Sequence, residues 1–507
     1  MKRYIFFLSL CLLLPTAFVF AQPGSLDSSF SNDGLVKTKI SPSGGSAVLS
    51  IAVQNDGKII AAGQTFEGSG YSFGLVRYSS SGIPDNSFGN KGLVTTKFNS
   101  LSASIGSIAI QTNGMIVAGG FSTGGALMVR YKKSGALDNS FGIDGKITSD
   151  FGGSDEGIYS IVLQSDGKII AAGGAGGQFA VARYKQNGTR DSTFGINGLV
   201  TTGLGHNTTS KGRGVTIQSD GKILIAGYTV DKHGEYNAVL IRYKKNGRLD
   251  NHFGNGGIVI TDLGSSSDTY TSLIIRPNGK INTAGFIGNI HQENFVLAQY
   301  NNDGILDSSF GTNGFTSTDF SNAGDEANAL ALQADGDIIL AGTTQSWEAP
   351  HYIKFALARY TQNGTIDSAF GADGKVVPDF GGYGLALNIQ FDGKILAGGS
   401  SGVYAVVARY NADSSNLQFD KNLTKQQINK STTISLSPNP VKDVLYLRGM
   451  STNKKSISII SENGSASQHI VTENSSYTIN TKQLKAGVYF VKITEGGKTT
   501  TLKFLKD

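Results

Sequence analysis

The stretch Gln164-Ser165-Asp166-Gly167-Lys168-Ile169-Ile170-Ala171-Ala172-Gly173 decides how this chain folds. An Asp-Gly pair between apolar, β-branched runs is the strongest local signal for a β-hairpin. It predicts a type I′ turn, in which both central residues have positive φ, a conformation that Asp or Asn followed by Gly tolerates. The pair recurs at Asp56-Gly57, Asn113-Gly114, Asp220-Gly221, Asn278-Gly279, Asp335-Gly336 and Asp392-Gly393. Repeated copies of one hairpin therefore organise the sequence.

Each hairpin lies inside a longer repeat that spans residues 26–410. In the third copy a first strand begins at residues 145–148, a second covers 158–163, a third 168–172 and a fourth 179–184. Each shows period-2 alternation or a short apolar run between turn residues. Four strands in each of seven units predict an all-β, seven-bladed β-propeller, whose blades must stack because one unit cannot bury its own faces.

The head of each unit has fixed spacing. An aspartate is followed by phenylalanine three residues later, at Asp27, Asp85, Asp138, Asp191, Asp250, Asp307 and Asp367. In five units an arginine precedes this aspartate by eight residues, as Arg183 precedes Asp191. We expect a repeated Arg–Asp ion pair there, because the arginine fork suits carboxylates. The fifth unit, with Gln299 at the arginine position, should lack it.

The length variation is confined to one kind of connection. The tyrosine that closes the fourth strand precedes the next head aspartate by seven residues in all six cases, whereas the distance from the hairpin Asp or Asn to that tyrosine varies between 18 and 25 residues. In an up-and-down blade the third-to-fourth and first-to-second connections share one face, here called the loop face. The hairpins and fourth-to-first connections share the opposite hairpin face. Loops on a rigid scaffold usually carry function, so we predict binding on the loop face.

The two ends of the repeat predict how the ring closes. A lone strand at residues 35–40 precedes the first complete unit, and the seventh unit stops after Tyr410. We predict that this strand joins the last blade. Residues 411–432 are polar without apolar periodicity and are predicted to be a linker. Short strands at 444–447, 456–460, 477–479, 488–493 and 499–504 predict a small immunoglobulin-like β-sandwich over residues 433–507.

The N-terminus predicts secretion. Met1-Lys2-Arg3 precedes an apolar run from Tyr4 to Phe20, which is typical of a signal peptide, and we predict cleavage after Ala21, so that the propeller covers residues 22–410. The run is short for a membrane span and contains Pro15, and no later stretch is apolar enough to span a bilayer. We therefore expect no transmembrane segment after cleavage.

Composition excludes several chemistries. The only cysteine is Cys11, inside the predicted signal peptide, so disulfides and thiolate catalysis are excluded from the mature chain. Loss of Lys2 and Arg3 would lower the formal net charge from +6 to +4, and the remaining basic residues are dispersed, which argues against nucleic acid as a partner. The hairpin aspartates lack the pattern of a calcium loop, the histidines lack metal-ligand spacing, and catalytic motifs are missing. We expect no metal, no cofactor and no catalytic residue.

Two families share these motifs. The units, with Leu-Asp-x-Ser-Phe-Gly-x-x-Gly and Gln-x-Asp-Gly-Lys-Ile-Ile-Ala-Ala-Gly, resemble the delta-60 repeat of bacterial secreted proteins. Residues 433–507 are similar to the type A C-terminal sorting domain of the type IX secretion system of Bacteroidota. The matching sorting-domain residues include Pro438, Asn439, Pro440, Gly464, Gly487, Tyr489 and Lys503. This resemblance implies the type IX machinery as a partner, export across the outer membrane, and a released or surface-attached product.

Candidate ligand residues lie in the long third-to-fourth connections of units four to six. They are His233, Tyr236, His291, Glu293, Trp347, Glu348, His351 and Tyr352. Aromatic and polar groups gathered around a cleft suit glycan or peptide capture. We therefore predict a non-catalytic binding or scaffold protein at the cell surface, with a glycan or protein ligand. The alternative is a carbohydrate-active hydrolase or lyase that uses loop-face carboxylates such as Asp155, Glu156, Asp325, Glu326 and Glu348.

Overall fold

The computed structural model describes residues 22–98, 102–205, 208–289, 291–320, 324–346, 351–412, 435–437, 444–448, 455–461, 466–472, 476–485, 487–495 and 498–506. The chain divides into two compact units, Met1–Leu417 and Gln418–Asp507. The described residues form strands and turns, and none of them belongs to a helix that could cross a membrane. The predicted signal peptide and linker lie outside them, so the domain boundaries given above stay predictions.

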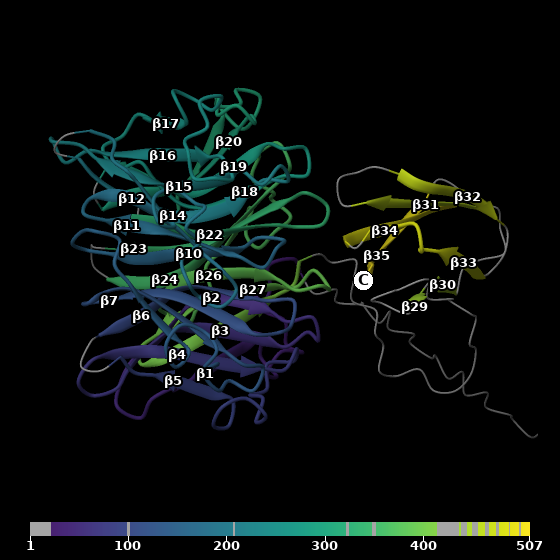
Figure 1. Ribbon diagram of the computed structural model, residues 1–507, viewed down its shortest axis with the longest axis horizontal. Helices are drawn as coiled ribbons and strands as arrows, with labels where there is room; N and C mark the ends of the chain where they lie inside the picture. The colour runs from purple at the N-terminus through teal and green to yellow at the C-terminus, as the bar shows by residue number, and fades with distance from the viewer. Residues whose placement is uncertain are drawn as a thin grey trace, which may run out of the picture. The chain divides into compact units, whose positions relative to one another are not determined.

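The first unit is a seven-bladed propeller, as predicted (Figure 1). Blade 1 contains β2 (Ser46–Val53), β3 (Ile59–Phe66), β4 (Tyr71–Tyr78) and β5 (Leu93–Thr96); blade 2 contains β6 (Ala103–Ile110), β7 (Ile116–Ser122), β8 (Gly125–Tyr131) and β9 (Lys146–Ser149); blade 3 contains β10 (Gly157–Leu163), β11 (Ile169–Ala175), β12 (Gln178–Tyr184) and β13 (Leu199–Thr202); blade 4 contains β14 (Thr209–Ile217), β15 (Ile223–Val230), β16 (Tyr236–Tyr243) and β17 (Ile258–Thr261). Blade 5 contains β18 (Thr269–Ile275), β19 (Ile281–Asn289), β20 (Gln292–Tyr300) and β21 (Phe315–Thr318); blade 6 contains β22 (Gly324–Leu332), β23 (Ile338–Ser346), β24 (Tyr352–Tyr360) and β25 (Lys375–Val376); blade 7 contains β26 (Tyr383–Ile389), β27 (Ile395–Ser401), β28 (Tyr404–Tyr410) and β1 (Leu35–Thr38).

The innermost strand of each blade is the second strand of the predicted unit, and the first strand of the next unit along the chain becomes the outermost, a point that the sequence left open. The innermost strands are in contact from one blade to the next: β2, β6, β10, β14, β18, β22 and β26. The core consists of apolar layers between neighbouring blades. One layer joins Ile60 and Leu75 of blade 1 to Ile105 and Ile116 of blade 2, all fully buried. Burial at these interfaces provides the hydrophobic stabilisation that a single blade lacks.

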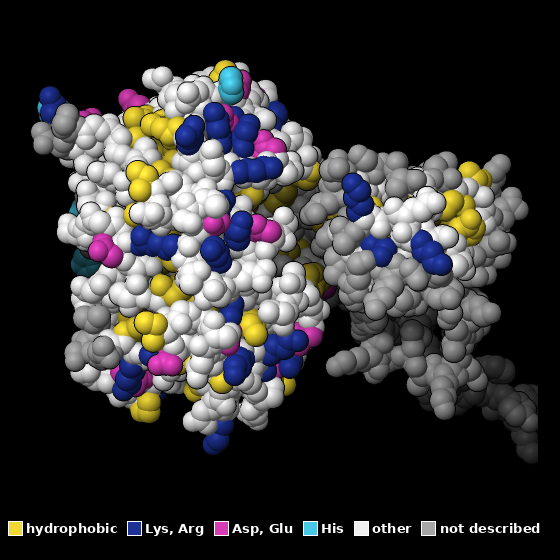
Figure 2. Space-filling view, in the orientation of Figure 1, with side chains coloured by type: hydrophobic (Ala, Val, Ile, Leu, Met, Phe, Trp, Pro, Cys, Tyr) yellow, Lys and Arg dark blue, Asp and Glu magenta, His cyan; other side chains and the backbone are white. Residues whose placement is uncertain are grey.

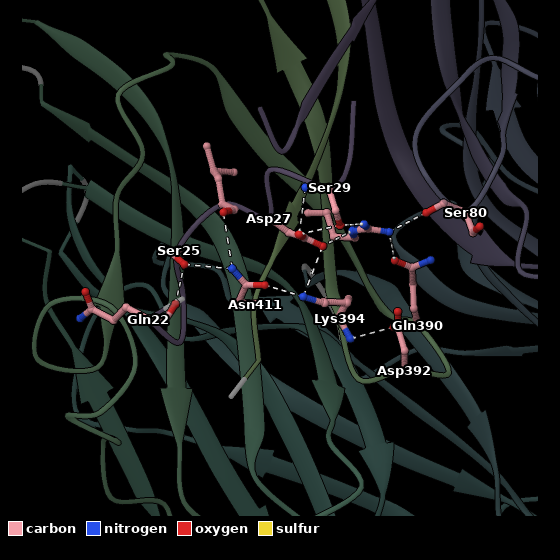
Figure 3. A network of polar contacts seen from close by, with 11 residues as sticks. Gln22, Ser25, Asp27, Ser29, Ser80, Gln390, Asp392, Lys394 and Asn411 are labelled. Atoms are coloured by element: carbon pink, nitrogen blue, oxygen red, sulfur yellow. Dashed lines mark hydrogen bonds and ion pairs between the residues drawn. The ribbon is translucent and has the colours of Figure 1, made fainter. Parts of the chain in front are cut away.

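The ring closes as predicted. Strand β1 pairs with β28 from Leu35 opposite Ala408 to Thr38 opposite Ala405, and it ends two residues before the predicted strand does. In Figure 1 the purple N-terminal strands and the green strands of the last blade accordingly lie side by side. Figure 3 shows the polar network at this closure, in which Asp27 Oδ2 lies 2.8 Å from Arg409 Nε and 3.3 Å from Lys394 Nζ.

The hairpin prediction was correct in place but wrong in turn type. Gly167 has a φ of 79°, whereas Asp166 does not have a positive φ. The amide of Gly167 donates to Gln164 O (2.9 Å), and the amide of Gln164 donates to Lys168 O (2.8 Å). This is a three-residue loop, a type I turn completed by a glycine bulge, rather than a two-residue type I′ turn. Asp166 favours it because its carboxylate accepts a hydrogen bond from the amide of Lys168 (3.1 Å).

The predicted Arg–Asp ion pair is present in all five units. The Nε–Oδ2 distances are 2.6–2.9 Å for Arg77–Asp85, Arg130–Asp138, Arg183–Asp191, Arg242–Asp250 and Arg359–Asp367. Ring closure creates a sixth pair, Arg409–Asp27. Each of these six arginines also lies over the head phenylalanine of its own turn, at 4.5–5.0 Å. The repeated head motif is therefore a binding site for a buried arginine.

Arg183 illustrates what this arrangement joins. Its Nη1 donates to the carbonyl of Lys245 in blade 4 (2.6 Å), so one side chain links two blades. The second oxygen of Asp191 accepts bonds from the amide and hydroxyl of Thr193 (3.2 and 2.8 Å). Burial raises the pKa of Asp191, but the Thr193 hydrogen bonds and the Arg183 charge outweigh burial and lower the pKa to about 2. The carboxylate thus stays charged under ordinary conditions.

The C-terminal unit consists of two sheets. Their strand orders are β29-β30-β33 and β32-β31-β34-β35, with bounds Ser435–Ser437, Val444–Arg448, Lys455–Ser461, Ala466–Thr472, Ser476–Asn480, Gly487–Glu495 and Lys498–Lys506 for β29, β30, β31, β32, β33, β34 and β35. All five predicted strands are present, and β29 and β32 are additional. Leu445, Ile457, Val491 and Phe504 are fully buried in its core.

Candidate functional site

A β-bulge interrupts every innermost strand near its loop-face end. In blade 3 the register shifts between Ile158 and Ser160, so Tyr159 has no partner opposite it. The bulged residues of blades 1 to 7 are Leu49, Gly106, Tyr159, Arg213, Thr271, Asn328 and Leu385. A bulge redirects a side chain and often lies beside functional sites. At the bulges the backbone conformation repeats from blade to blade while the side chain differs. In the head motif, by contrast, the side chains repeat as well.

The bulges of blades 3 and 4 bring an aromatic ring and two cations together. The guanidinium carbon of Arg213 lies 5.2 Å from the centre of the Tyr159 ring, and Lys211 Nζ lies 5.8 Å from it. Both distances permit a cation–π interaction. Lys211 also forms an ion pair of 2.5 Å with Asp155. The ring of Phe121 in blade 2 also contacts Tyr159, with ring centres 5.2 Å apart.

Two further tyrosines of blade 4 extend this group. The rings of Tyr228, on β15, and Tyr236, on β16, are 5.4 Å apart. Burial raises the pKa of Tyr228, and the charges of Arg213 and Lys211 oppose that rise, so the cations lie close to its hydroxyl. The mouth cluster is defined here as Phe121, Tyr159, Lys211, Arg213, Tyr228 and Tyr236. All of its members are half-buried.

Two carboxylates continue the arc around the mouth of the channel. Glu293 belongs to β20 of blade 5 and Glu326 to β22 of blade 6. Burial raises the pKa of Glu326, the Glu293 carboxylate raises it further, and the Arg213 guanidinium opposes both. Cations, tyrosines and acids from blades 3 to 6 therefore share one electrostatic environment.

Other loop-face acids have local partners. Asp155 pairs with Lys211, and the Glu156 carboxylate accepts a hydrogen bond from the amide of Gly153 (2.8 Å). Asp325 is fully buried and accepts from the amide of Phe320 (2.7 Å). Burial raises the pKa of Asp325 to about 6. Among the described residues, groups of His, Cys, Asp and Glu that could hold a metal ion are absent.

The residues predicted from the sequence divide into three groups. Tyr236 and Glu293 lie in the arc just described. His233, His291 and His351 are exposed in their connections, and Tyr352 begins β24 with Lys354 Nζ 5.7 Å from its ring. Trp347 and Glu348 lie outside the described residues. The structure therefore brings two of the predicted residues together with the mouth cluster.

Sequence reasoning missed Tyr159, Arg213 and Tyr228. They lie within strands, where the alternation of apolar residues predicts a role in packing. A comparison of the seven copies contains a signal, because the bulge position holds Leu, Gly, Tyr, Arg, Thr, Asn and Leu, whereas the next position always holds Ser, Gly or Ala. A position that varies in size and charge beside one that stays small is the pattern to seek.

The hairpin face contains two hollows, but scaffold residues line them. One, of about 360 Å³, is lined by Arg242, His252 and Asn302. The other, of about 400 Å³, lies between the hairpins of blades 6 and 7 beside Gln333 and Gln390. Arg242 Nη1 donates to Asn302 O of blade 5, the same interblade contact that Arg183 makes with Lys245 O, so we assign these hollows to the scaffold. On the side shown in Figure 2, Lys and Arg lie among Asp and Glu across several blades.

Part of the predicted sorting motif falls on described residues. Gly487 begins β34, and Tyr489 stacks on Phe504 at 5.5 Å and donates its hydroxyl to Lys485 O at 3.1 Å. Lys503 pairs with Phe490 between β34 and β35. Pro438, Asn439, Pro440 and Gly464 lie outside the described residues.

Fold and site together define a β-propeller with a side-chain cluster at its channel mouth, followed by a separate β-rich unit. Comparison with family models agrees with this division. The model described as a domain of unknown function (DUF5122) beta-propeller matches residues 54–88, 111–141, 164–194, 218–253, 276–310, 333–370 and 390–415, and the model of the secretion system C-terminal sorting domain matches residues 435–507. The chain is therefore a DUF5122 β-propeller protein with a type IX sorting domain, exported to the cell surface or the extracellular space.

Several solved structures are similar to this chain at low sequence identity and low TM-score. Sqt1 of Chaetomium thermophilum is 12% identical, with 74% of this chain and 98% of that one covered and a TM-score of 0.41. A family PL25 ulvan lyase is 11% identical, covering 78% and 95%, with a TM-score of 0.40. A family AA12 carbohydrate-active enzyme of Trichoderma reesei is 14% identical, covering 78% and 98%, with a TM-score of 0.30. No curated protein sequence matches the chain. At these values no activity carries over.

Proposed function

We propose that this exported propeller is a non-catalytic binding protein that holds a glycan at the loop-face mouth of its channel. The observation that carries the proposal is the mouth cluster, where Tyr159, Tyr228 and Tyr236 surround two cations and remain half-buried. Sugars present apolar ring faces and many hydroxyls. Aromatic walls with a few convergent polar groups suit such ligands.

The test is a glycan and cell-wall polymer array probed with the full chain. A Tyr159→Ala/Tyr228→Ala variant removes two walls of the mouth, and a Trp347→Ala/His351→Ala variant removes the side chains predicted from the sequence. Phe391→Ala, which removes an aromatic that is 75% exposed on the hairpin face, is the matched control. We expect the mouth variant to lose binding and the control to keep it. Two results would overturn the proposal. Either the mouth variant still binds the glycan, or the folded wild type binds no glycan on the array.

A carbohydrate-active enzyme remains the second candidate, because Glu326 has a raised pKa and lies near Glu293. A carboxyl group of this kind can act as a general acid. Incubating array-positive polymers with the wild type and with Glu326→Gln would distinguish the two functions. Release of short or unsaturated products by the wild type, lost in the variant, would favour the enzyme. Binding without any product favours the binding protein.

A further inference from the structure

Arg213 differs from the buried arginines of the hairpin face. Those six each pair with a carboxylate, lie over a phenylalanine, and donate to a carbonyl of the neighbouring blade or of the segment that follows β28, as Arg409 does to Ser80 O (2.5 Å). Arg213 also lies over an aromatic ring, but it makes no hydrogen bond or ion pair with any described residue. All seven arginines therefore lie over an aromatic ring, and Arg213 differs because it lacks a carboxylate and a carbonyl partner within the described part of the chain.

An unpaired guanidinium in a half-buried position is costly unless a ligand completes it. Burial removes part of the hydration of a charged group, and that loss is offset only by hydrogen bonds and an opposite charge. The planar fork of arginine presents parallel N–H groups that fit a carboxylate or sulfate group with two hydrogen bonds. Arg213 therefore has the chemistry of an anion receptor.

Its neighbours restrict what the anion belongs to. Lys211 is paired with Asp155, so the two do not add a free charge at the mouth. Tyr159 and Tyr228 flank Arg213, and their hydroxyls have no hydrogen-bond partner among the described residues. Glu293 and Glu326 lie farther along the arc and can accept hydrogen bonds from hydroxyl groups. A free inorganic anion would use the fork alone, whereas a sugar ring with an acidic substituent uses the rings, the acids and the fork.

We propose that Arg213 binds the acidic substituent of an anionic saccharide whose ring packs against Tyr159 and Tyr228. This inference rests on the proposed glycan-binding function and specifies its ligand class. The acidic group could be a uronate carboxylate or a sulfate ester, which share the bidentate geometry. Binding should be electrostatic in part and should weaken as salt rises.

The test measures affinity of the full chain for matched saccharides. Oligogalacturonate, the same oligomer with its carboxyl groups reduced, and a sulfated galactan provide uronate, neutral and sulfate arms. The wild type should bind at least one acidic arm about tenfold or more tighter than the neutral one. Arg213→Gln should lose that preference and its salt dependence, so that its acidic arms bind no tighter than the neutral arm. Arg213→Lys, which keeps the charge without the fork, should be intermediate.

The control is Lys354→Gln, which removes another loop-face cation that lies over a tyrosine. We expect its affinities within about twofold of wild type, and unchanged melting temperatures for all variants. Equal binding of acidic and neutral arms, or acidic binding that Arg213→Gln leaves intact, would overturn the anion site while the glycan function stands. A folded wild type that binds no arm and no polymer on the array would overturn both.

Discussion

The fifth blade and the other six build the same interblade contact from different positions of the repeat. In six blades the arginine lies on the third strand from the centre, as Arg242 does on β16. In blade 5 that position holds Gln299, and Arg276 occupies the hairpin position where blade 4 has Gln218. Arg276 Nη1 donates to Gln362 O of blade 6 (2.7 Å), just as Arg183 donates to Lys245 O of blade 4 (2.6 Å).

The head aspartate of blade 5 keeps the lysine partner of the other blades but lacks the arginine. Asp307 pairs with Lys280 at 2.5 Å, as Asp250 pairs with Lys222 at 3.2 Å. With its amide turned over, Gln299 places nitrogen 2.9 Å from Asp307 Oδ2 and oxygen 3.2 Å from Arg276 Nη1. Burial lowers the pKa of Arg276, and Asp337 of blade 6 opposes that effect. The comparison teaches that each blade interface has a guanidinium, while the position of the repeat that supplies it can change.

The largest expected effect comes from removing an arginine in one of the six blades. Arg242→Ala leaves the carboxylate of Asp250, which is 1% exposed, with Lys222 alone at 3.2 Å. We expect a loss of about 3–5 kcal/mol in the free energy of unfolding, as for other broken buried ion pairs. Gln299→Ala is the matched control at the same position of blade 5 and should cost less than half as much. Equal losses in denaturant titrations would contradict the comparison.

The exchange itself can be reversed. Arg276→Gln removes the guanidinium from Gln362 O, and Gln299→Arg places a second guanidinium beside the first. Each single variant should lose about 2–3 kcal/mol of unfolding free energy, because a buried partner is left unpaired or like charges meet. The double variant recreates the arrangement of the other blades and should lie within about 1 kcal/mol of the wild type. Additive losses in the double-mutant cycle would show that the two positions act independently.

How much the sequence reveals depends on how far apart the partners lie. The Arg–Asp pair was predictable because eight residues across one tight turn bring Arg183 and Asp191 together. The lone strand before the first unit likewise predicted the closure by β1. The turn type at Asp166 was wrong because a side-chain hydrogen bond to Lys168 outweighs the local preference of an Asp-Gly pair. Strand β29 has only three residues, and β32 begins with the polar run Ser467-Gln468-His469, so neither shows the apolar alternation that reveals the others.

The site was only partly predictable for the same reason. Tyr236 and Glu293 stood out because they lie in the long connections. Arg213 and Tyr159 come from neighbouring blades, and a one-residue register shift in each strand directs them to one place. Register shifts depend on packing between blades, which a single sequence does not state.

Blade 6 offers a second departure, measurable through pH. Asp325 occupies the position where blades 1 and 4 have Ser46 and Ser210, which bond to Thr65 and Thr229. Burial raises the pKa of Asp325 to about 6, and Asp319 adds to the rise while Lys375 opposes it. The folded pKa exceeds the unfolded one, so stability should fall as the pH rises through about 6.

Asp325→Asn removes that titration. We expect the variant to be more stable than the wild type at pH 8 by on the order of 2 kcal/mol and nearly equal to it at about pH 3, below the unfolded pKa of 3.8. Melting curves at both pH values measure the difference. Asp325→Ser, which copies blades 1 and 4, should behave in the same way. A gap between wild type and variant that does not change with pH would contradict the assignment.

The smallest effect concerns a buried tyrosine hydroxyl. In six blades this hydroxyl bonds to a threonine or serine on the outer strand of the preceding blade, in the pairs Tyr78–Thr38, Tyr131–Thr96, Tyr184–Ser149, Tyr243–Thr202, Tyr300–Thr261 and Tyr360–Thr318. Blade 7 departs, because Pro378 occupies the threonine position beyond β25 and the fully buried Tyr410 hydroxyl has no partner among the described residues.

Pro378→Thr should restore the contact and stabilise the protein by about 1 kcal/mol, the usual net value of one buried hydrogen bond. Loss of the proline also frees the unfolded chain, which subtracts a few tenths of a kcal/mol from the gain. Pro378→Val has the shape of threonine without its hydroxyl and isolates the hydrogen bond from the backbone change. A higher melting temperature for Thr than for Val would attribute the gain to Tyr410. If the two variants have the same melting temperature, blade 7 gains nothing from this hydrogen bond. The tyrosine–threonine contact then contributes less at the ring closure than in the other blades.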